Sequence, residues 1–68
     1  MIELLIAARK DAGITQVELG KRIGKRQTFV SKFEQGERGL DIAEFIMVSR
    51  AIGTDPHQII RIAEAAER

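Results

Sequence analysis

Apolar residues recur along most of this 68-residue chain at intervals of three and four, the spacing of helices with one buried face. Five segments carry the pattern, at about 2–12, 15–23, 26–35, 41–52 and 56–67. No stretch alternates between apolar and polar residues over a useful length, so strands are not expected. The pattern therefore predicts an all-α fold of five short helices joined by brief connections.

Capping residues mark the starts of three of these segments, and a fourth start lacks one. Thr15-Gln16-Val17-Glu18 and Asp41-Ile42-Ala43-Glu44 both fit the capping box, in which the first side chain and the glutamate each accept a backbone N–H. Asp55-Pro56 provides a cap and a first helical residue for the fifth segment. The third segment instead starts after Lys25 and Arg26, where Ser, Thr or Asp is usual. Such a break of a local rule is typical of a functional site.

The first four segments have apolar side chains that we expect to face the core. These are Leu4, Leu5, Ala8 and Ala12; then Val17, Leu19 or Gly20, and Ile23; then Val30 and Phe33; and then Phe45, Val48 and Ile52. The third segment also has an outward polar and basic face without catalytic chemistry, made of Gln27, Thr28, Ser31 and Lys32. A turn containing Gly24 joins the second and third segments, so residues at about 15–35 fit a helix-turn-helix unit.

The charge of the chain is unevenly distributed. The net charge is only +1, but the stretch from Lys21 to Arg38 holds six basic and two acidic residues, a local charge of +4. The rest of the chain has five basic and eight acidic residues, for a charge of −3. A positive stretch on the suspected binding unit favours an anionic partner such as a nucleic acid.

Several classes of function are not expected from the composition. An enzyme is not expected, because His57 is the only histidine and lacks a constellation of carboxylates or cysteines. The absence of cysteine excludes disulfides and thiolate zinc sites, and we expect no cofactor or metal. No stretch approaches the ~20 apolar residues of a membrane span, and Glu3 interrupts the apolar start where a signal peptide would lie. We therefore expect a cytoplasmic protein.

The motifs of the second and third segments, taken together, resemble those of a known family. Gly13-x-Thr15-Gln16-x-x-Leu19-x-x-x-Ile23-Gly24 is followed by Val30-Ser31-x-x-Glu34-x-Gly36. From about Leu5 to Ile60 the chain resembles the small stand-alone Cro/cI-type (XRE) helix-turn-helix regulators of bacteria and phages. The resemblance implies one lambda-repressor-like five-helix domain over residues 1–68, binding double-stranded DNA. It places the third helix in the major groove and the second across the sugar-phosphate backbone.

The resemblance also assigns roles to individual residues. Gln27, Thr28 and Lys32 match base-reading positions, with Ser31 close enough to contribute. Glutamine can pair with adenine, lysine with guanine, and the threonine methyl with thymine. The phosphate-contacting positions are matched by Gln16 and Arg38, and Lys25 and Arg26 are placed to add further backbone contacts. Arg9 and Glu34 match a partly buried ion pair that fixes the third helix, a structural role.

Two residues depart from the pattern of the family. Gly20 stands where alanine is usual, and it allows a closer approach of the third helix at a cost in helix propensity of roughly 1 kcal/mol. Phe29 replaces a small polar residue. Its ring either packs against the loop at Leu40, which we favour, or lies against a thymine methyl. The operator sequence therefore cannot be copied from a relative.

One short helix reads only a few base pairs, so we expect a homodimer on an inverted-repeat operator with half-sites about 34 Å apart. A chain of this length also buries little surface, which favours oligomerisation. Ile60 and Ile62 point about 200° apart on a helical wheel, so one core cannot take both. The interface predicted on the fifth helix consists of Ile59, Ile60, Ile62, Ala63 and Ala66. The alternative is that these residues only cap the core of the monomer.

A transcriptional repressor without a small-molecule effector is the expected function. The main alternative is an antitoxin-like or other protein-interaction module with the same fold. The chain ends at Arg68 directly after the fifth segment, which leaves no room for a neutralising extension and disfavours that alternative. Binding to RNA is also disfavoured, because the chain has no Tyr or Trp with which to build a stacking platform.

Overall fold

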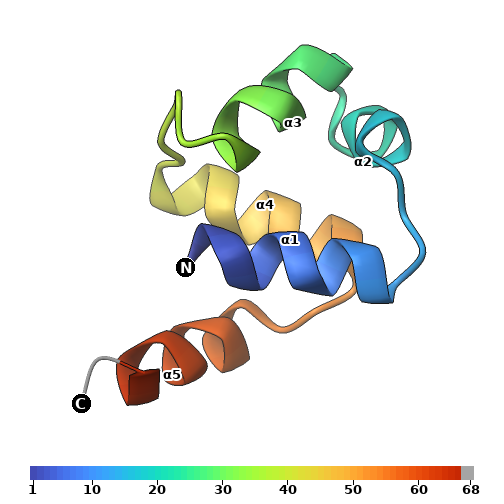
Figure 1. Cartoon of the computed structure of the whole chain (residues 1–68). Helices are drawn as coiled ribbons and strands as arrows, with labels where there is room; N and C mark the ends of the chain where they lie inside the picture. The colour runs from blue at the N-terminus through green and yellow to red at the C-terminus, as the bar shows by residue number, and fades with distance from the viewer. Residues whose placement is uncertain (67–68) are drawn as a thin grey trace.

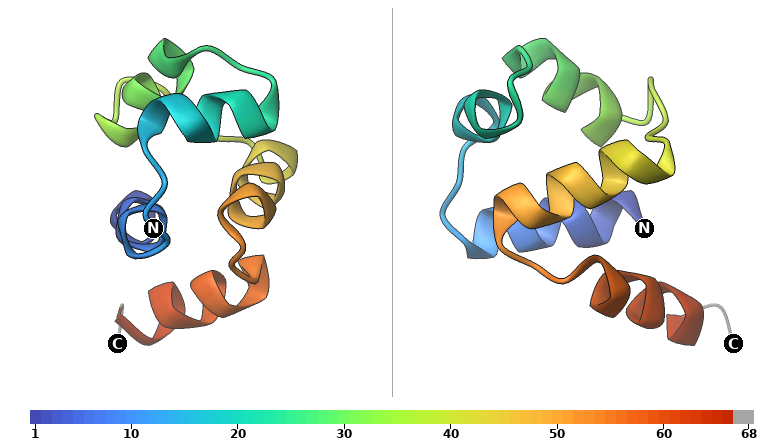
Figure 2. Two further views of the ribbon diagram at one scale, coloured as in Figure 1. Left: turned by 90° about the vertical axis from the view of Figure 1, so that its right-hand side faces the viewer. Right: turned by 180° about the vertical axis from the view of Figure 1, so that it is seen from behind.

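The computed structural model describes residues 1–66 and contains five helices in that range. The helices are α1 (Ile2–Asp11), α2 (Gln16–Ile23), α3 (Gln27–Glu34), α4 (Ile42–Ile52) and α5 (Pro56–Ala66). Helices α1 and α4 form a middle layer, with α2 and α3 on one side of it and α5 on the other (Figures 1 and 2). No strand occurs within residues 1–66, and the predicted end of the fifth helix at residue 67 lies outside the described residues. The all-α, five-helix prediction is confirmed.

The core is one cluster to which every helix contributes. Its buried members are Leu5, Ile14, Leu19, Ile23, Val30, Phe33, Phe45, Val48, Ile52 and Ile59. Two inward predictions were wrong, because Val17 and Ala12 are exposed. Val17 lies two residues before Leu19, about 200° around the helix from the face that packs on the core. Ala12 is the C-cap of α1, past the last residue of the buried stripe.

The two predicted capping boxes differ in the structure. At α4 the box is complete, because Asp41 Oδ1 accepts from Glu44 N at 2.7 Å and Glu44 Oε1 accepts from Asp41 N at 3.0 Å. At α2 only half of it forms, with Thr15 Oγ1 accepting from Glu18 N at 3.1 Å. The Glu18 carboxylate instead accepts from Arg22 Nε, one turn later, at 3.3 Å. A cationic donor at i+4 therefore takes the carboxylate that the box would have used.

Gly20 of α2 lies against the turn that leads into α3. Lys25 N donates to Gly20 O at 2.9 Å, which brings the turn back onto α2. A Cβ atom at Gly20 would lie 2.9 Å from Lys25 O and 3.3 Å from the carbonyl carbon of Arg26. Both atoms belong to the backbone, so they cannot move aside as a side chain could. The glycine therefore sets the position of α3 relative to α2.

Gly20→Ala is expected to lower the free energy of unfolding by up to about 2 kcal/mol, the net of a propensity gain and a larger packing cost. Alanine gains roughly 1 kcal/mol of helix propensity, but overpacking against fixed backbone costs about 1–3 kcal/mol. Urea unfolding measures the net change, and amide chemical shifts at Lys25 and Arg26 report movement of the turn. Lys21→Ala, at the exposed neighbouring position, is the control without a clash. A Gly20→Ala protein stabilised by the full gain in propensity would contradict this account.

Candidate nucleic-acid interface

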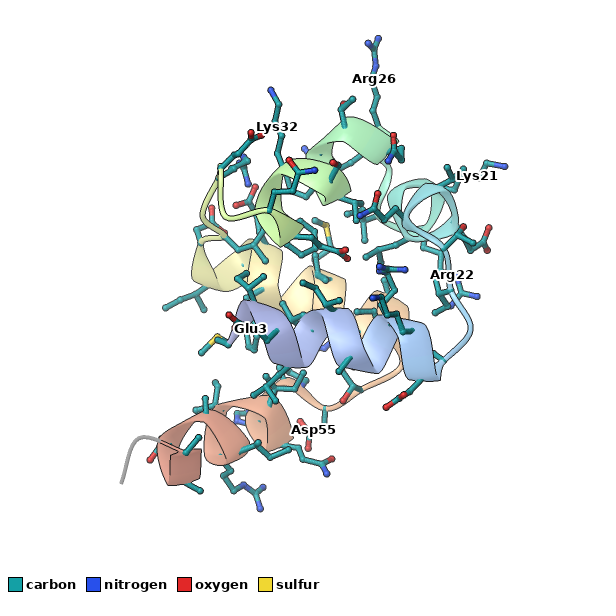
Figure 3. The ribbon with its side chains drawn as sticks, viewed as in Figure 1. Glu3, Lys21, Arg22, Arg26, Lys32 and Asp55 are labelled. Atoms are coloured by element: carbon teal, nitrogen blue, oxygen red, sulfur yellow. The ribbon has the colours of Figure 1, made fainter. Side chains whose placement is uncertain are left out.

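The outer face of α3 carries the polar side chains predicted to read bases. Gln27, Thr28 and Lys32 are exposed, and Figure 3 shows Lys32 pointing away from the core. Ser31 is half-buried, and its Oγ accepts from Gln35 Nε2 at 3.2 Å. Positions 27, 28, 31 and 32 repeat at helical spacing, so these four side chains share one side of the helix. The structure thus places the four predicted residues together, with Ser31 the least accessible.

The amino end of α3 is open and positively charged. Arg26 is the N-cap residue, and its side chain makes no capping hydrogen bond. The first N–H groups of a helix form the positive end of its dipole, which attracts anions. Lys25 and Arg26 are both exposed at this end, and Arg26 projects outward beyond α3 in Figure 3. The missing cap in the sequence therefore corresponds to an end of α3 suited to an anion.

Arg9 and Glu34 form the predicted ion pair between α1 and α3. Arg9 Nε donates to Glu34 Oε2 at 2.7 Å and Arg9 Nη2 donates to Glu34 Oε1 at 3.0 Å, a bidentate arrangement. The side chains are only 9% and 7% exposed. Arg9 Nη1 also donates to Ile14 O at 2.8 Å, which ties the pair to the turn before α2. This pair therefore connects the helix-turn-helix unit to α1.

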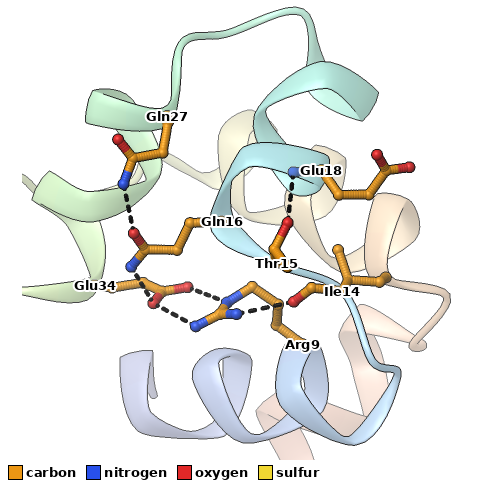
Figure 4. A network of polar contacts seen from close by, with 7 residues as sticks. All are labelled: Arg9, Ile14, Thr15, Gln16, Glu18, Gln27 and Glu34. Atoms are coloured by element: carbon orange, nitrogen blue, oxygen red, sulfur yellow. Dashed lines mark hydrogen bonds and ion pairs between the residues drawn. The ribbon is translucent and has the colours of Figure 1, made fainter.

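The ion pair continues outward through two glutamines (Figure 4). Gln16 Nε2 donates to Glu34 Oε1 at 3.0 Å, and Gln27 Nε2 donates to Gln16 Oε1 at 2.7 Å. An ionised carboxylate only accepts hydrogen bonds, so Gln16 must present its NH₂ group to Glu34 and its oxygen to Gln27. Gln27 in turn must donate. The buried charge pair thus fixes the orientation of an exposed amide on α3.

The tethered Gln27 retains the groups that a base would need. Its NH₂ carries a second hydrogen, and its carbonyl oxygen is not used by the bond to Gln16. A free donor next to a free acceptor is the pattern that pairs with N7 and the N6 amino group of adenine. The resemblance pointed to Gln16 and Gln27 separately. The bond between them was missed, because their sequence separation gives no sign of contact.

Arg38 was predicted as a phosphate contact, and the structure shows that its guanidinium is already hydrogen-bonded within the protein. Its Nη1 and Nη2 donate to the two carboxylate oxygens of Glu44 at 3.1 and 2.8 Å, and Nη1 also donates to Gly39 O at 3.0 Å. The guanidinium carbon lies 4.6 Å from the centre of the Phe29 ring. The hydrogen bond from Arg38, followed by that from the Asp41 backbone, holds the pKa of Glu44 below its ordinary value. Arg38 therefore packs on α3 and α4 while remaining exposed at the surface.

Phe29 packs inward on the core. Its ring meets Phe33 edge-on, with centroids 5.9 Å apart, and it is half-buried. Lys25 Nζ lies 5.6 Å from the centre of the ring, so one cation from the turn before α3 and one from the loop after it approach the ring. Of the two orientations left open by the sequence, this one matches packing toward the loop that follows α3. The residue of this loop that lies over the ring is Arg38, two positions before Leu40.

Arg22 belongs to the basic stretch but serves the fold. Its Nη1 donates to Ala51 O at 3.0 Å, which satisfies a carbonyl in the last turn of α4. This contact could not be predicted from the sequence, because the two residues are far apart along the chain. Lys21, Lys25, Arg26 and Lys32 are exposed cations on or beside α2 and α3. The positive charge of the helix-turn-helix unit is thus partly structural and partly available to a ligand.

The structure divides the predicted dimer residues of α5. Ile59 is 3% exposed within the core of a single chain, so its assignment to an interface was wrong. Ile59 belongs to the apolar core, because α5 packs against both α1 and α4. Ile60 and Ile62 are 37% and 46% exposed, Ala63 is half-buried, and Ala66 is exposed. Ile60 lines a groove beside α4 and Ile62 lines a different groove beside α1. The two exposed isoleucines therefore do not share one surface.

No helix in residues 1–66 has the length and apolar character needed to cross a membrane.

Comparison with known proteins identifies the family of the chain. No curated protein matches it. The model of the helix-turn-helix family HTH_3 matches residues 5–59. A solved structure, an XRE-family like protein from Pseudomonas syringae pv. tomato str. DC3000, is 49% identical with a TM-score of 0.94. The match covers 98% of this chain and 82% of that one. The chain therefore belongs to the XRE family of helix-turn-helix DNA-binding regulators.

Proposed function

We propose that the protein binds specific double-stranded DNA sequences by placing α3 in the major groove. The observation that carries this proposal is the chain of hydrogen bonds from Arg9 through Glu34 and Gln16 to Gln27. It orients an exposed amide on α3 in advance of binding, which lowers the entropic cost of recognition. Gln27, Thr28 and Lys32 are the proposed base-reading residues, with a smaller contribution from the half-buried Ser31.

The proposed phosphate contacts surround this face. Gln16 lies in the first turn of α2, and its amide nitrogen has a second hydrogen besides the one given to Glu34. Lys25 and Arg26 lie at the open amino end of α3. Arg38 is proposed as the fourth contact, where a phosphate would share the guanidinium with the Glu44 carboxylate or displace that carboxylate. Contacts of this kind set the register on the duplex without reading its sequence.

We further propose that the protein acts as a homodimer on an inverted repeat, as a cytoplasmic repressor without a small-molecule effector. One α3 helix of eight residues can read only a short half-site. Two copies related by a two-fold axis would read two half-sites about 34 Å apart. Binding of such a dimer across a promoter would block transcription. No separate sensor is needed, because occupancy would follow the concentration of the protein.

A salt titration on duplex DNA tests the core of this proposal. Affinity for a random-sequence duplex should fall steeply as salt rises, because each phosphate contact releases condensed counterions. Lys32→Ala should reduce the slope by about one if Lys32 also touches phosphate, and leave the slope unchanged if it contacts only bases. A folded sample that binds no duplex at low salt would overturn the proposal. The antitoxin-like role in protein binding would then be favoured.

A further inference from the structure

An apolar groove lies between α4 and α5. Its cavity volume is about 450 Å³, and its apolar lining includes Met1, Ile42, Phe45, Ile46, Pro56 and Ile60. Five large apolar side chains are exposed among residues 1–66, and three of them, Met1, Ile42 and Ile60, line this groove. Ile42 is 79% exposed, the most of the five. Three exposed apolar side chains thus meet at one groove and form a contiguous apolar surface that a partner could cover.

The groove lies away from the proposed DNA-binding face. In Figure 2, α2 and α3 lie on one side of α4 and α5 lies on the other. The labelled cations Arg26 and Lys32 extend from the α3 side of the molecule in Figure 3. A partner seated between α4 and α5 would therefore leave the outer face of α3 free to meet DNA.

Charged residues stand at the two ends of the α4 side of the groove. Asp41 precedes Ile42 at the amino end of the helix, and Arg50 lies near the carboxyl end. Both are exposed. Ile42, Ile46 and Arg50 are spaced by four residues, so they form one stripe along α4 about 12 Å long. The stripe is thus apolar in the middle, negative at one end and positive at the other.

We propose that a second copy of this chain occupies the groove, with the two α4 helices antiparallel about a two-fold axis near Ile46. This arrangement places Asp41 beside Arg50 of the partner subunit, and the reverse contact follows by symmetry. Ile42 then packs on the aliphatic stem of that arginine, and Ile60 closes the side of the contact. The self-complementary charge pattern is what singles out a second copy as the partner. The inference rests on the homodimer proposed above and names its interface.

The groove on the other side of α5 provides a matched control. Ile62 lines that second groove together with Leu4, Ala8 and Ile59. It is an exposed isoleucine on α5, as Ile60 is, but it does not line the groove beside α4. A substitution at Ile62 therefore changes exposed apolar surface without touching the proposed interface.

Sedimentation equilibrium without DNA tests the interface. Ile42→Lys should raise the dimer dissociation constant about 30-fold or more, because it replaces an apolar contact with a cation beside Arg50 of the partner subunit, while Ile62→Lys leaves it unchanged. Ile42→Lys should still fold, because the Ile42 side chain is 79% exposed. A wild-type protein that stays monomeric, or equal effects of the two variants, would overturn the proposal.

Cross-linking tests the antiparallel arrangement directly, because the chain has no cysteine of its own. Ile42→Cys and Arg50→Cys proteins, mixed and mildly oxidised, should form a disulfide-linked heterodimer in higher yield than either protein alone. Equal yields in all three samples would contradict the two-fold pairing. DNA binding is measured separately, by titrating the same proteins on a random-sequence duplex. A protein that fails the interface tests but still binds this duplex would overturn the interface and leave the proposed function standing.

Discussion

Replacing Glu34 with alanine is expected to lower the free energy of unfolding by about 3–5 kcal/mol. The substitution leaves the Arg9 guanidinium unpaired in a site where its side chain is 9% exposed. It also removes the acceptor for Gln16. Cores of this size rarely supply more than about 3–5 kcal/mol in total, so the variant should be largely unfolded at 25 °C. Circular dichroism at 222 nm, with urea titration, measures the loss.

Two further variants show whether the effect comes from the buried pair. Glu34→Gln keeps an acceptor of similar shape but removes the charge, so its loss should be smaller than that of Glu34→Ala. Glu18→Gln breaks the exposed pair with Arg22, for which we expect a change below about 1 kcal/mol. A Glu34→Ala protein as stable as the Glu18→Gln protein would show that the Arg9–Glu34 pair does not hold α3 in place.

Replacing Gln27 with alanine is expected to weaken binding to the preferred operator by about 1–3 kcal/mol, or roughly 5- to 150-fold. Binding to a scrambled duplex should hardly change, because Gln27 is proposed to contact a base rather than phosphate. Fluorescence anisotropy on both duplexes at one salt concentration measures the two effects. The control is Gln58→Ala, at an exposed glutamine on α5, which should leave both affinities unchanged.

The hydrogen bond between Gln16 and Gln27 can be tested by combining substitutions at the two residues. If Gln16 orients Gln27, the losses caused by Gln16→Ala and Gln27→Ala should not add in the double variant. The expected coupling on the operator is about 0.5–3 kcal/mol, with none on the scrambled duplex. Equal losses from Gln27→Ala on both duplexes would assign this residue to phosphate. Additive losses of operator affinity in the double variant would show that Gln16 does not orient Gln27.

The sequence predicted the helices well because the signals for them are local. The turn at Gly24 and the capping box at Asp41 depend only on residues a few positions apart, and both form as expected. The half-formed box at Thr15 shows the limit of such rules. Glu18 has two possible partners within one turn, and Arg22 prevails over the backbone. Competition between local partners cannot be decided from a motif alone.

The contacts that the sequence missed join residues distant along the chain. Arg22 to Ala51, and Gln16 to Gln27, depend on how the helices pack. The burial of Ile59 likewise depends on where α5 docks. The periodicity of α5 showed that Ile60 and Ile62 diverge, but only the packing shows which groove each one lines. The Arg9–Glu34 pair was predicted despite its long separation, because the resemblance to the family supplied what the spacing could not.

Sequence-specific reading by α3 can be measured by selecting binding sites from a random duplex pool and then titrating the winning and scrambled duplexes with salt. A dimer that reads bases should enrich an inverted repeat with half-sites one helical turn apart. The winning duplex should then bind far more tightly than the scrambled duplex at matched salt. A folded protein that enriches no sequence, or that binds both duplexes equally at every salt concentration, would contradict sequence-specific reading by α3.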